Sequence, residues 1–599
     1  MATDSTDTLL DLICRWLEWD EDKETRREIE QLWIAKNTKE LEKRLRHRIQ
    51  FGTAGLRGRM AAGFSCMNSL TVIQTSQGLA KYIKNKHRNL SHLGVVIAYD
   101  SRHNSHKFAT LAASAFVVMG IKVHWYEKMS PTPLVSFGVE RLRAVAGIMI
   151  TGSHNPAQDN GYKVYFKNGA QINSPMDAEI SRSIEENLKP WATAWFDWGV
   201  TLSSALINLD PYRMVSLSYI GARSTVSRIG TPSPFIYTPL HGVGATTLAV
   251  MLHAMGIGEV MLSVSVQFEP DPDFPTVQFP NPEEAGALDL AIRLADKEKR
   301  QIVIANDPDA DRFAAAEKVN GSWFFFSGNH IGVLLASHIF DSLQSEKKKY
   351  AVVLNSTVST TMLEKMARSI GIRFRETLTG FKWMGNIARE IENEGHSVIF
   401  AFEEAFGYMF PEVCHDKDGL TAAAVFLAAE AKWRKKGLSP YMKLQQLFKE
   451  YGHHETMNSY FRSPNPETTV ALFNGIRSWS FTKGKPLGSF RISRWRDMTE
   501  GYDSETTNNT PLLPVDRGSQ MLTIWMDRDI KFTLRGSGTE PKVKLYIESC
   551  QPSRQEAVTA VCDTFSVVFK EWILPFAPTM TWHPTIATSS GHIFRVGEV

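Results

Sequence analysis

Short apolar runs that end in polar residues, with helical patterns between them, constrain the fold of this chain most. In its first third the runs lie at 94–100, 121–126 and 144–150, and helix-like segments at 105–119 and 134–143 separate them. Strands that alternate with helices of this length predict a parallel sheet with helices on both faces.

Two later stretches repeat the same order. In the first of them, strand candidates at 235–244 and 301–307 flank a helix at 245–255. In the second, strand candidates at 351–357 and 397–407 flank a helix that ends at about residue 369. From about residue 460 the runs become short and alternating, with one helix at 553–571, while 9–46 has a helical pattern and the tail beyond Leu574 has no periodicity. The sequence therefore predicts an α/β chain with three consecutive doubly wound α/β domains and a C-terminal α+β domain.

Composition excludes several classes of function. A net charge of +3 over 599 residues gives no reason to expect a nucleic-acid partner. The five cysteines form no CxxC pair, which favours a reducing compartment. The N-terminus lacks the basic start of a secretory signal, and the most apolar stretch, 111–121, is roughly half as long as a membrane-spanning helix. We expect a cytoplasmic protein without a membrane partner.

Ligands of parallel α/β sheets bind at the carboxyl ends of strands, so the residues that follow each run are the candidates for chemistry. The run that ends at Ile150 is followed by TGSHNP, which places Ser153 and His154 in a strand-end loop. A serine there more often caps a turn or helix than reacts. The motif is not the GxSxG elbow of acyl hydrolases.

The run 301–307 ends at Asp307, the first residue of the motif DPDADR. In this motif Asp307, Asp309 and Asp311 occupy every second position, and Arg312 follows them. Alternate spacing in a turning loop can aim three carboxylates at one point, which suits an octahedral Mg²⁺ site. An acid-rich turn without metal is the alternative, and an EF-hand is excluded because its fixed Gly and final Glu are missing.

Two further polar segments complete the set. Glu403 and Glu404 come directly after SVIFAF, 397–402. They could accept hydrogen bonds from sugar hydroxyls, or could form a charge pair at a helix N-terminus. The segment RGSGTEPKVK, 535–544, combines Arg, Ser, Thr and Lys with two glycines, as phosphate-holding loops do. A serine nucleophile, a metal loop, acids for a polyol and a phosphate loop are together what phosphoryl transfer to a sugar requires.

At these four loops, in this order, the chain resembles the α-D-phosphohexomutase superfamily. Closer marks are FGTAGLRG, YTPLHGVG, PDPDFPTVQFPNPEE, ETLTGFKWMGN and FEEAFGYM, which resemble the phosphoglucomutase-2 and phosphopentomutase branch. The resemblance implies four domains around a central active-site cleft. The domain boundaries expected on that plan are 1–215, 216–328, 329–458 and 459–599.

The resemblance also implies roles for individual residues. Ser153 would carry the phosphate and would bind Mg²⁺ together with Asp307, Asp309 and Asp311. Arg57 and Lys163 would lie beside it, Lys163 as a general acid or base, and His154 would support the loop. Substrate would contact the following residues: Arg312, Thr379, Gly380, Lys382, Glu403, Glu404, Arg535, Ser537, Gly538 and Thr539.

Two departures from the family pattern concern the serine and sugar loops. Gly152 replaces the Ala of many relatives and is expected to loosen the serine loop. Ala405 and Phe402 stand where ordinary phosphoglucomutases carry Ser and Gly, which removes one hydroxyl contact to a hexose. This loss is compatible with a pentose substrate and also with broader specificity.

The resemblance therefore implies a phosphopentomutase that interconverts ribose or deoxyribose 1-phosphate with the 5-phosphate, with a slower phosphoglucomutase activity. A sugar bisphosphate would act as primer, small sugar phosphates would be the partners, and a monomer is expected. The alternatives are a glucose 1,6-bisphosphate synthase that uses 1,3-bisphosphoglycerate and a non-catalytic sugar-phosphate sensor. Phosphatase activity agrees less well with these four loops, because simple hydrolysis does not require a separate loop that holds a second phosphate.

Overall fold

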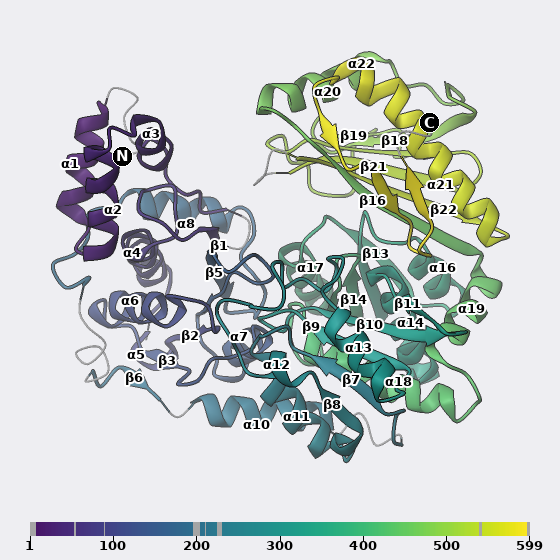
Figure 1. Cartoon of the computed structure of the whole chain (residues 1–599), viewed down its shortest axis with the longest axis horizontal. Helices are drawn as coiled ribbons and strands as arrows, with labels where there is room; N and C mark the ends of the chain where they lie inside the picture. The colour runs from purple at the N-terminus through teal and green to yellow at the C-terminus, as the bar shows by residue number, and fades with distance from the viewer. Residues whose placement is uncertain are drawn as a thin grey trace. The chain divides into compact units, whose positions relative to one another are not determined.

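The computed structural model describes residues 7–52, 55–88, 90–195, 204–209, 211–224, 230–537 and 542–595 (Figure 1). The chain divides into two compact units. The first comprises Met1–Lys318 and Gly380–Lys436, and the second comprises Val319–Thr379 and Gly437–Val599. In the described part of the chain, no helix combines the length and apolarity needed to cross a membrane.

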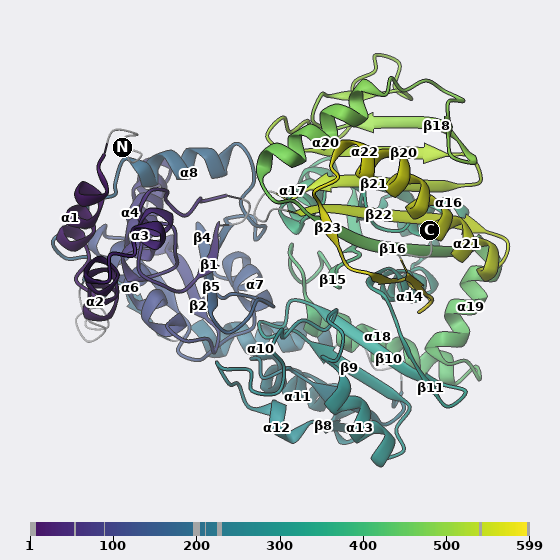
Figure 2. The same ribbon diagram turned by 45° about the horizontal axis from the view of Figure 1, so that its top comes forward.

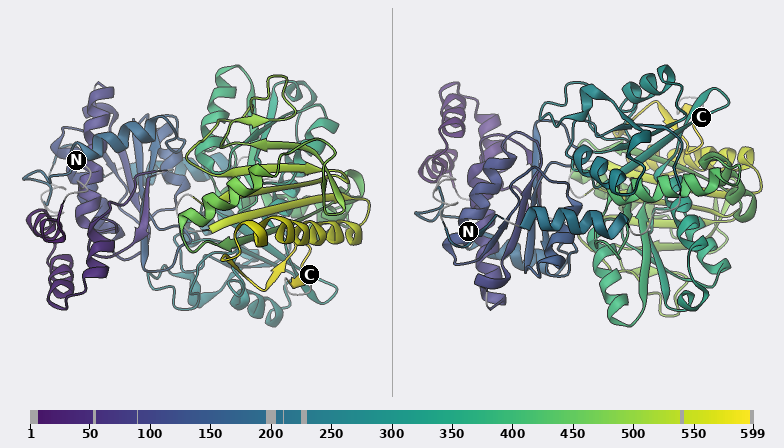
Figure 3. Two further views of the ribbon diagram at one scale, coloured as in Figure 1. Left: turned by 90° about the horizontal axis from the view of Figure 1, so that it is seen from above. Right: turned by 90° about the horizontal axis from the view of Figure 1, so that it is seen from below.

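Three N-terminal helices confirm the helical pattern of 9–46. They are α1 (Leu9–Trp19), α2 (Lys23–Ile34) and α3 (Thr38–Leu45). Thr8 begins α1 with a capping box to Asp11. Trp16 and Ile29, both fully buried, share a small core with Phe64, so the helices (purple in Figure 3) pack on the first α/β domain.

The first sheet has the strand order β1-β5-β4-β2-β3-β6. Its strands are β1 (Gly55–Arg59), β2 (Val95–Tyr99), β3 (Val123–Trp125), β4 (Ala146–Ile150), β5 (Asp159–Phe166) and β6 (Ile207–Asn208). Strands β2, β3, β4 and β6 are parallel, whereas β5 is antiparallel to both β4 and β1. The helices of this domain are α4 (Ser69–Lys86), α5 (Leu90–Leu93), α6 (Ser105–Val118), α7 (Pro133–Arg141), α8 (Met176–Glu185) and α10 (Pro211–Ser224).

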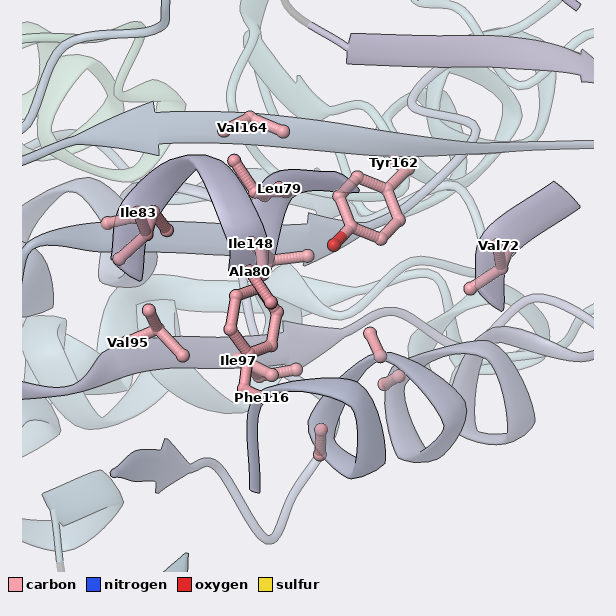
Figure 4. Packing of buried hydrophobic residues seen from close by; sticks show 14 of the residues in the cluster. Val72, Leu79, Ala80, Ile83, Val95, Ile97, Phe116, Ile148, Tyr162 and Val164 are labelled. Carbon is pink, nitrogen blue, oxygen red and sulfur yellow. The ribbon is translucent and has the colours of Figure 1, made fainter. Parts of the chain in front are cut away.

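Apolar side chains from alternate strand positions make the core of this domain (Figure 4). Ile97 on β2 and Ile148 on β4 pack against Leu79 of α4 and Phe116 of α6, and all four are fully buried. On the opposite face Gly147 lies against Val135 and Val139 of α7. Burial on both faces explains why these strands read as continuous apolar runs.

The second α/β domain has parallel strands β7 (Phe235–Thr238), β8 (Met261–Ser263) and β9 (Ile302–Asn306), and β10 (Phe313–Val319) is antiparallel to β9. Strand β11 (Ser322–Phe325) follows. The helices are α11 (Gly244–Ala254), η1 (Gly258–Val260), α12 (Ser265–Phe268) and α13 (Asp289–Lys297).

The elements of the third α/β domain belong to both units. In the second unit β12 (Ala351–Ser356) is parallel to β13 (Arg373–Thr377), and in the first β14 (Ser397–Glu403) is antiparallel to β15 (Gly407–Met409). The helices are α14 (Gly328–Asp341), α15 (Ser345–Lys348), α16 (Met362–Ser369), α17 (Phe381–Asn393), α18 (Gly419–Arg434) and α19 (Pro440–Tyr451).

The sheets are mixed rather than purely parallel, which differs from the pattern-based expectation. In each α/β domain the strand that leads to a polar loop turns directly into an antiparallel strand: β4 into β5, β9 into β10, and β14 into β15. The connecting loops, 151–158, 307–312 and 404–406, are too short for a parallel crossover, which needs about a dozen residues or more. The polar loops are therefore hairpin turns.

The C-terminal domain is α+β, as predicted. Its antiparallel sheet contains β17 (Pro486–Leu487), β18 (Phe490–Asp497), β20 (Met521–Met526), β21 (Ile530–Gly536), β22 (Lys542–Gln551), β16 (His453–Arg462) and β23 (Thr581–Trp582) in that order, and β19 (Tyr502–Asp503) pairs with β18. Helices α20 (Pro466–Ser478) and α21 (Arg554–Val568) lie across one face (Figure 2). A π turn, Phe569–Ile573, and α22 (Leu574–Phe576) continue α21.

The tail beyond Leu574, which had no assignable pattern, is also ordered into strands. It supplies β23 to the sheet and then forms a hairpin of β24 (Thr585–Ala587) and β25 (Ile593–Arg595). Trp582 packs edge-on against Phe569 at 4.6 Å between ring centroids. The tail is therefore part of the C-terminal domain.

Candidate active site

Ser153 lies in the turn between β4 and β5 with its side chain facing the acidic loop of the second domain. It is 2% exposed, and its backbone has a φ of +54°. Its hydroxyl lies 3.2 Å from His154 Nδ1 and donates to Asp307 Oδ2 at 3.4 Å. Burial, and then Arg312 and Arg57, lower the pKa of His154 well below its ordinary value, so a neutral imidazole adjoins the serine.

The three aspartates of the second loop converge beside Ser153. Asp307, Asp309 and Asp311 are fully buried, and one ligand oxygen from each lies within 4.8 Å of the others. Asp309 Oδ2 accepts from Thr132 Oγ1 at 2.6 Å and from Lys163 Nζ at 2.6 Å. The loop DPDADR is thus tied to two elements of the first domain.

The charge and burial of the three aspartates favour binding of a cation. Burial, and then Asp309 and Asp311, raise the pKa of Asp307 well above its ordinary value. Burial also opposes ionisation of Asp309, but Lys163 outweighs it and lowers the pKa of Asp309. Asp309 Oδ1 and Asp311 Oδ1 are buried without a hydrogen-bond partner. Clustered carboxylates with two unpaired buried oxygens fit a hard divalent cation.

Two lysines counter the negative charge of the triad. Lys163 on β5 lies 2.6 Å from Asp309 and 2.7 Å from Asp311. Burial lowers the pKa of Lys163, but the two carboxylates outweigh burial and raise it. Lys417, from the loop after β15, lies 3.3 Å from Asp311 and was not singled out from the sequence. Its loop carries no local motif that could have indicated this position.

Glu403 and Glu404, which the sequence predicts to bind sugar hydroxyls, lie in the same unit. The backbone N–H of Gly380 donates to Glu403 Oε2 at 3.1 Å. Burial, and then the neighbouring Glu404, raise the pKa of Glu403 to about 7. Lys382 lies over the ring of Trp383, 5.1 Å from its centroid.

Arg57, which was expected beside Ser153, and Arg312, which was expected to contact substrate, also have local partners in the first unit. Arg312 donates its backbone N–H to Asp307 at 2.9 Å, and its guanidinium to Asn281 at 3.5 Å. Arg57 donates to Asn155 in the serine loop at 3.4 Å. The structure therefore gathers Ser153, Lys163, Arg57 and Arg312 around the three aspartates.

The remaining predicted substrate residues belong to the second unit. Thr379 lies just beyond β13, and Arg535 lies near the end of β21, opposite Lys544 of β22. The N–H of Ser537 donates to Lys542 O at 2.8 Å. Gly538 and Thr539 lie outside the described residues.

Arg102 is a second residue that the sequence analysis missed. It follows β2, is 3% exposed and contacts the backbone of the serine loop. A Cβ on Gly152 would lie 2.9 Å from the Arg102 guanidinium and 2.8 Å from Asp159 O. The glycine thus permits close packing of the loop against Arg102 and Asp159.

Models of the three phosphoglucomutase/phosphomannomutase α/β/α domains match the chain in order. Domain I matches residues 48–190, domain II residues 217–321 and domain III residues 327–451. A phosphoribomutase of Saccharomyces cerevisiae is 43% identical, over 95% of this chain and 97% of its own length. The chain belongs to the phosphoglucomutase/phosphomannomutase family.

Other relatives define the branch within this family. A human phosphopentomutase is 44% identical, over 90% of this chain and 91% of its own length. A human glucose 1,6-bisphosphate synthase is 39% identical, over 90% and 89%. A solved structure of a putative phosphomannomutase from Thermus thermophilus has the same fold, with a TM-score of 0.63, 20% identity and coverage of 86% of this chain and 98% of its own. The predicted superfamily and fold class are confirmed.

Proposed function

We propose that this chain is a cytoplasmic phosphopentomutase that interconverts ribose or deoxyribose 1-phosphate with the corresponding 5-phosphate. The position of Ser153 Oγ, 3.4 Å from Asp307 in a buried carboxylate triad, carries the proposal. The family membership and the 43–44% identity to a phosphoribomutase and a phosphopentomutase support the reaction class and the pentose substrate.

In the proposed cycle, phospho-Ser153 gives its phosphoryl group to the free hydroxyl of a pentose monophosphate, and a pentose bisphosphate forms. The bisphosphate reorients, and its other phosphate returns to Ser153 as the isomer leaves. Ser153, Asp307, Asp309 and Asp311 would hold Mg²⁺, which would offset charge on the transferring group. A sugar bisphosphate would prime the serine.

The other residues have roles that follow from their positions. Lys163, which is protonated beside Asp309 and Asp311, is proposed as the general acid and base: it would give a proton to the departing Ser153 Oγ and regain one from the attacking hydroxyl. Arg57 would contact the same phosphoryl group. Lys382, Glu403 and Glu404 would bind sugar hydroxyls, with Arg312 and the Thr379–Gly380 turn beside them. The non-reacting phosphate would be bound by Arg535, Ser537, Gly538 and Thr539. The domain boundaries 1–215, 216–328, 329–458 and 459–599 belong to the same proposal.

Glucose 1,6-bisphosphate synthase activity is the second candidate, because a human synthase is 39% identical. The lower identity makes it less favoured than mutase activity. A non-catalytic sensor fits poorly, since Ser153 and all three aspartates are present and gathered together.

A side-by-side turnover assay tests the proposal. Ribose 1-phosphate and glucose 1-phosphate are compared at equal concentration with Mg²⁺ and a trace of sugar bisphosphate. A preference for ribose 1-phosphate of about tenfold or more is expected, because Ala405 removes a hydroxyl contact to a hexose. Slow turnover of both, with bisphosphate made from 1,3-bisphosphoglycerate, would favour the synthase. Full activity of Ser153→Ala would overturn both candidates.

A further inference from the structure

Ser153 adopts a backbone conformation that serine rarely occupies. Its φ of +54° falls in the left-handed region, which non-glycine residues occupy only when surrounding contacts hold them there. The Ser153 N–H donates to Thr151 Oγ1 at 2.8 Å, a contact within the loop itself. The loop therefore needs a second anchor from outside.

Arg102 supplies that anchor through four hydrogen bonds to main-chain carbonyls. Its Nη2 donates to Ser153 O and Asn155 O, both at 2.6 Å. Its Nη1 donates to Pro156 O at 2.7 Å and to Asp159 O at 3.0 Å. One guanidinium thus holds both ends of the turn that carries the serine.

Arg102 is itself held on two sides. Asp100 lies 3.4 Å from its Nε, both side chains are fully buried, and Asp100 also accepts from Ser105 Oγ at 2.6 Å. The ring of Phe274 lies 4.8 Å from the guanidinium carbon. Phe274 is 2% exposed, and Ala157 of the serine loop packs against its cluster.

The chain order explains how these groups meet. Strands β2 and β4 are parallel neighbours, so the loops that follow them emerge at the same edge of the sheet. Arg102 follows β2 and Ser153 follows β4. Phe274 comes from PDPDFPTVQFPNPEE of the second domain, a segment to which the proposed reaction assigns no other task.

We propose that Arg102 is a positioning residue for phosphoryl transfer, which fixes the serine loop so that Ser153 Oγ faces the triad; this rests on the proposed function. Four carbonyls that converge from two directions match the planar fork of a guanidinium with its five donors. A lysine ammonium has three donors at one point and cannot span the turn.

Arg102→Lys tests the proposal in the full chain. Turnover is expected to fall about 100-fold, because a displaced nucleophile loses its alignment, while KM changes less than about threefold since substrate contacts remain. Intact-mass measurement after incubation with glucose 1,6-bisphosphate should show slower uptake of phosphate at Ser153. Guanidinium chloride, at concentrations that leave the protein folded, should partly restore the turnover of Arg102→Ala.

Arg300→Lys is the matched control. Arg300 also donates to two carbonyls, Phe235 O at 2.9 Å and Val260 O at 2.6 Å, but within the second domain. The control should lower the unfolding temperature and leave turnover and phosphate uptake unchanged. If Arg102→Lys does not fold, Asp100→Asn replaces it, because it keeps the side-chain shape and removes the ion pair.

The outcomes separate the two proposals. If wild-type Ser153 takes up phosphate and Arg102→Lys, or its substitute Asp100→Asn, does so at the same rate with unchanged turnover, the positioning role is refuted while the proposed function stands. If Arg300→Lys lowers turnover as much as Arg102→Lys, the effect is general destabilisation and the positioning role is again refuted. If Ser153→Ala retains turnover, the proposed function itself fails.

Discussion

Asp309 contacts Lys163, the proposed general acid and base, and Thr132 of the first domain. Its carboxylate accepts from Thr132 and Lys163, and its other oxygen is buried without a partner. Asp309→Asn removes one charge from the proposed Mg²⁺ site at nearly constant shape. Turnover should fall by about 100-fold or more, because a charge that stabilises the transition state is lost. Initial rates measured across a Mg²⁺ series check this.

Asp296→Asn is the control for that substitution. Asp296 is a half-exposed carboxylate that pairs with Lys318 at 2.7 Å on the surface. Its replacement should leave turnover and the Mg²⁺ dependence unchanged. An Asp309→Asn variant with normal magnesium-dependent rates would place the metal elsewhere.

Glu403 predicts a pH dependence of substrate binding. Burial, and then Glu404, raise the pKa of Glu403 to about 7. The ionised carboxylate, which would accept hydrogen bonds from sugar hydroxyls, is therefore present above that pH. KM for ribose 1-phosphate should rise as pH falls through 7, and Glu403→Gln should remove this dependence. Because the folded state binds this proton more tightly than the unfolded state, the contribution of Glu403 to stability decreases as pH rises from its ordinary pKa to about 7. A wild-type KM that is flat between pH 6 and 8 would contradict the assignment.

Sequence reasoning found the residues that lie in a recognisable motif. It missed Lys417 and Arg102, which come close to the candidate site only through the fold. Ser153 and the aspartates stood in polar loops directly after apolar runs, where the strand-end rule directs attention. Lys417 follows an antiparallel strand and has no motif. Arg102 does follow a predicted strand, but an arginine in a polar loop is common, and only the fold shows that four carbonyls converge on it.

At the scale of elements, the strand and helix candidates named from the sequence lie at strands and helices of the structure, but β5 and β10, which run antiparallel after the polar loops, were not predicted as strands. Strand β5, DNGYKVYF, mixes polar and apolar residues although nearly all of them are buried, so its pattern did not mark it as a strand that pairs antiparallel with β4. Loop length carried that information. A connection as short as 151–158 can close a hairpin and cannot hold a crossover helix.

Helix α17 offers a test of how a helix holds the loop after β15, which carries Lys417 beside Asp311. A Cβ on Gly385 would lie 2.3 Å from His415 O in the loop that carries Lys417. Gly385→Ala should therefore destabilise the fold by about 1–3 kcal/mol, as overpacked sites do, and should lower turnover by displacing that loop. Urea unfolding and a turnover assay of the variant measure both effects.

Gly221→Ala is the matched helical control. A Cβ on Gly221 in α10 would meet no atom within 4 Å, so alanine should be neutral or should stabilise by up to about 1 kcal/mol through its higher helix propensity. Equal losses of stability in the two variants would show that close packing at Gly385 is not the cause.

At the scale of the whole molecule, the sequence predicted three α/β domains followed by an α+β domain. It did not predict the structure of the tail beyond Leu574. The tail beyond Leu574 has short strands interrupted by turn residues, and none is long enough to give a periodic signal. Its structure depends on long-range contacts instead: Phe461 pairs with Trp582 in the sheet, and Glu455 accepts from Ser589 and Ser590. Contacts between residues this far apart leave no local pattern.

Two isoleucines of the final hairpin test whether the tail stabilises the C-terminal domain. Ile586 is 7% exposed and packs into the domain core, whereas Ile593 on the paired strand is 65% exposed. Ile586→Ala should lower the free energy of unfolding by about 2–4 kcal/mol through lost burial and a cavity. Ile593→Ala should change it by less than about 0.5 kcal/mol. Urea unfolding of the full chain measures both, and equal effects would mean that the hairpin does not pack on the core as described. A large loss confined to Ile586→Ala would instead show that the last strands of the chain complete the domain that carries Arg535.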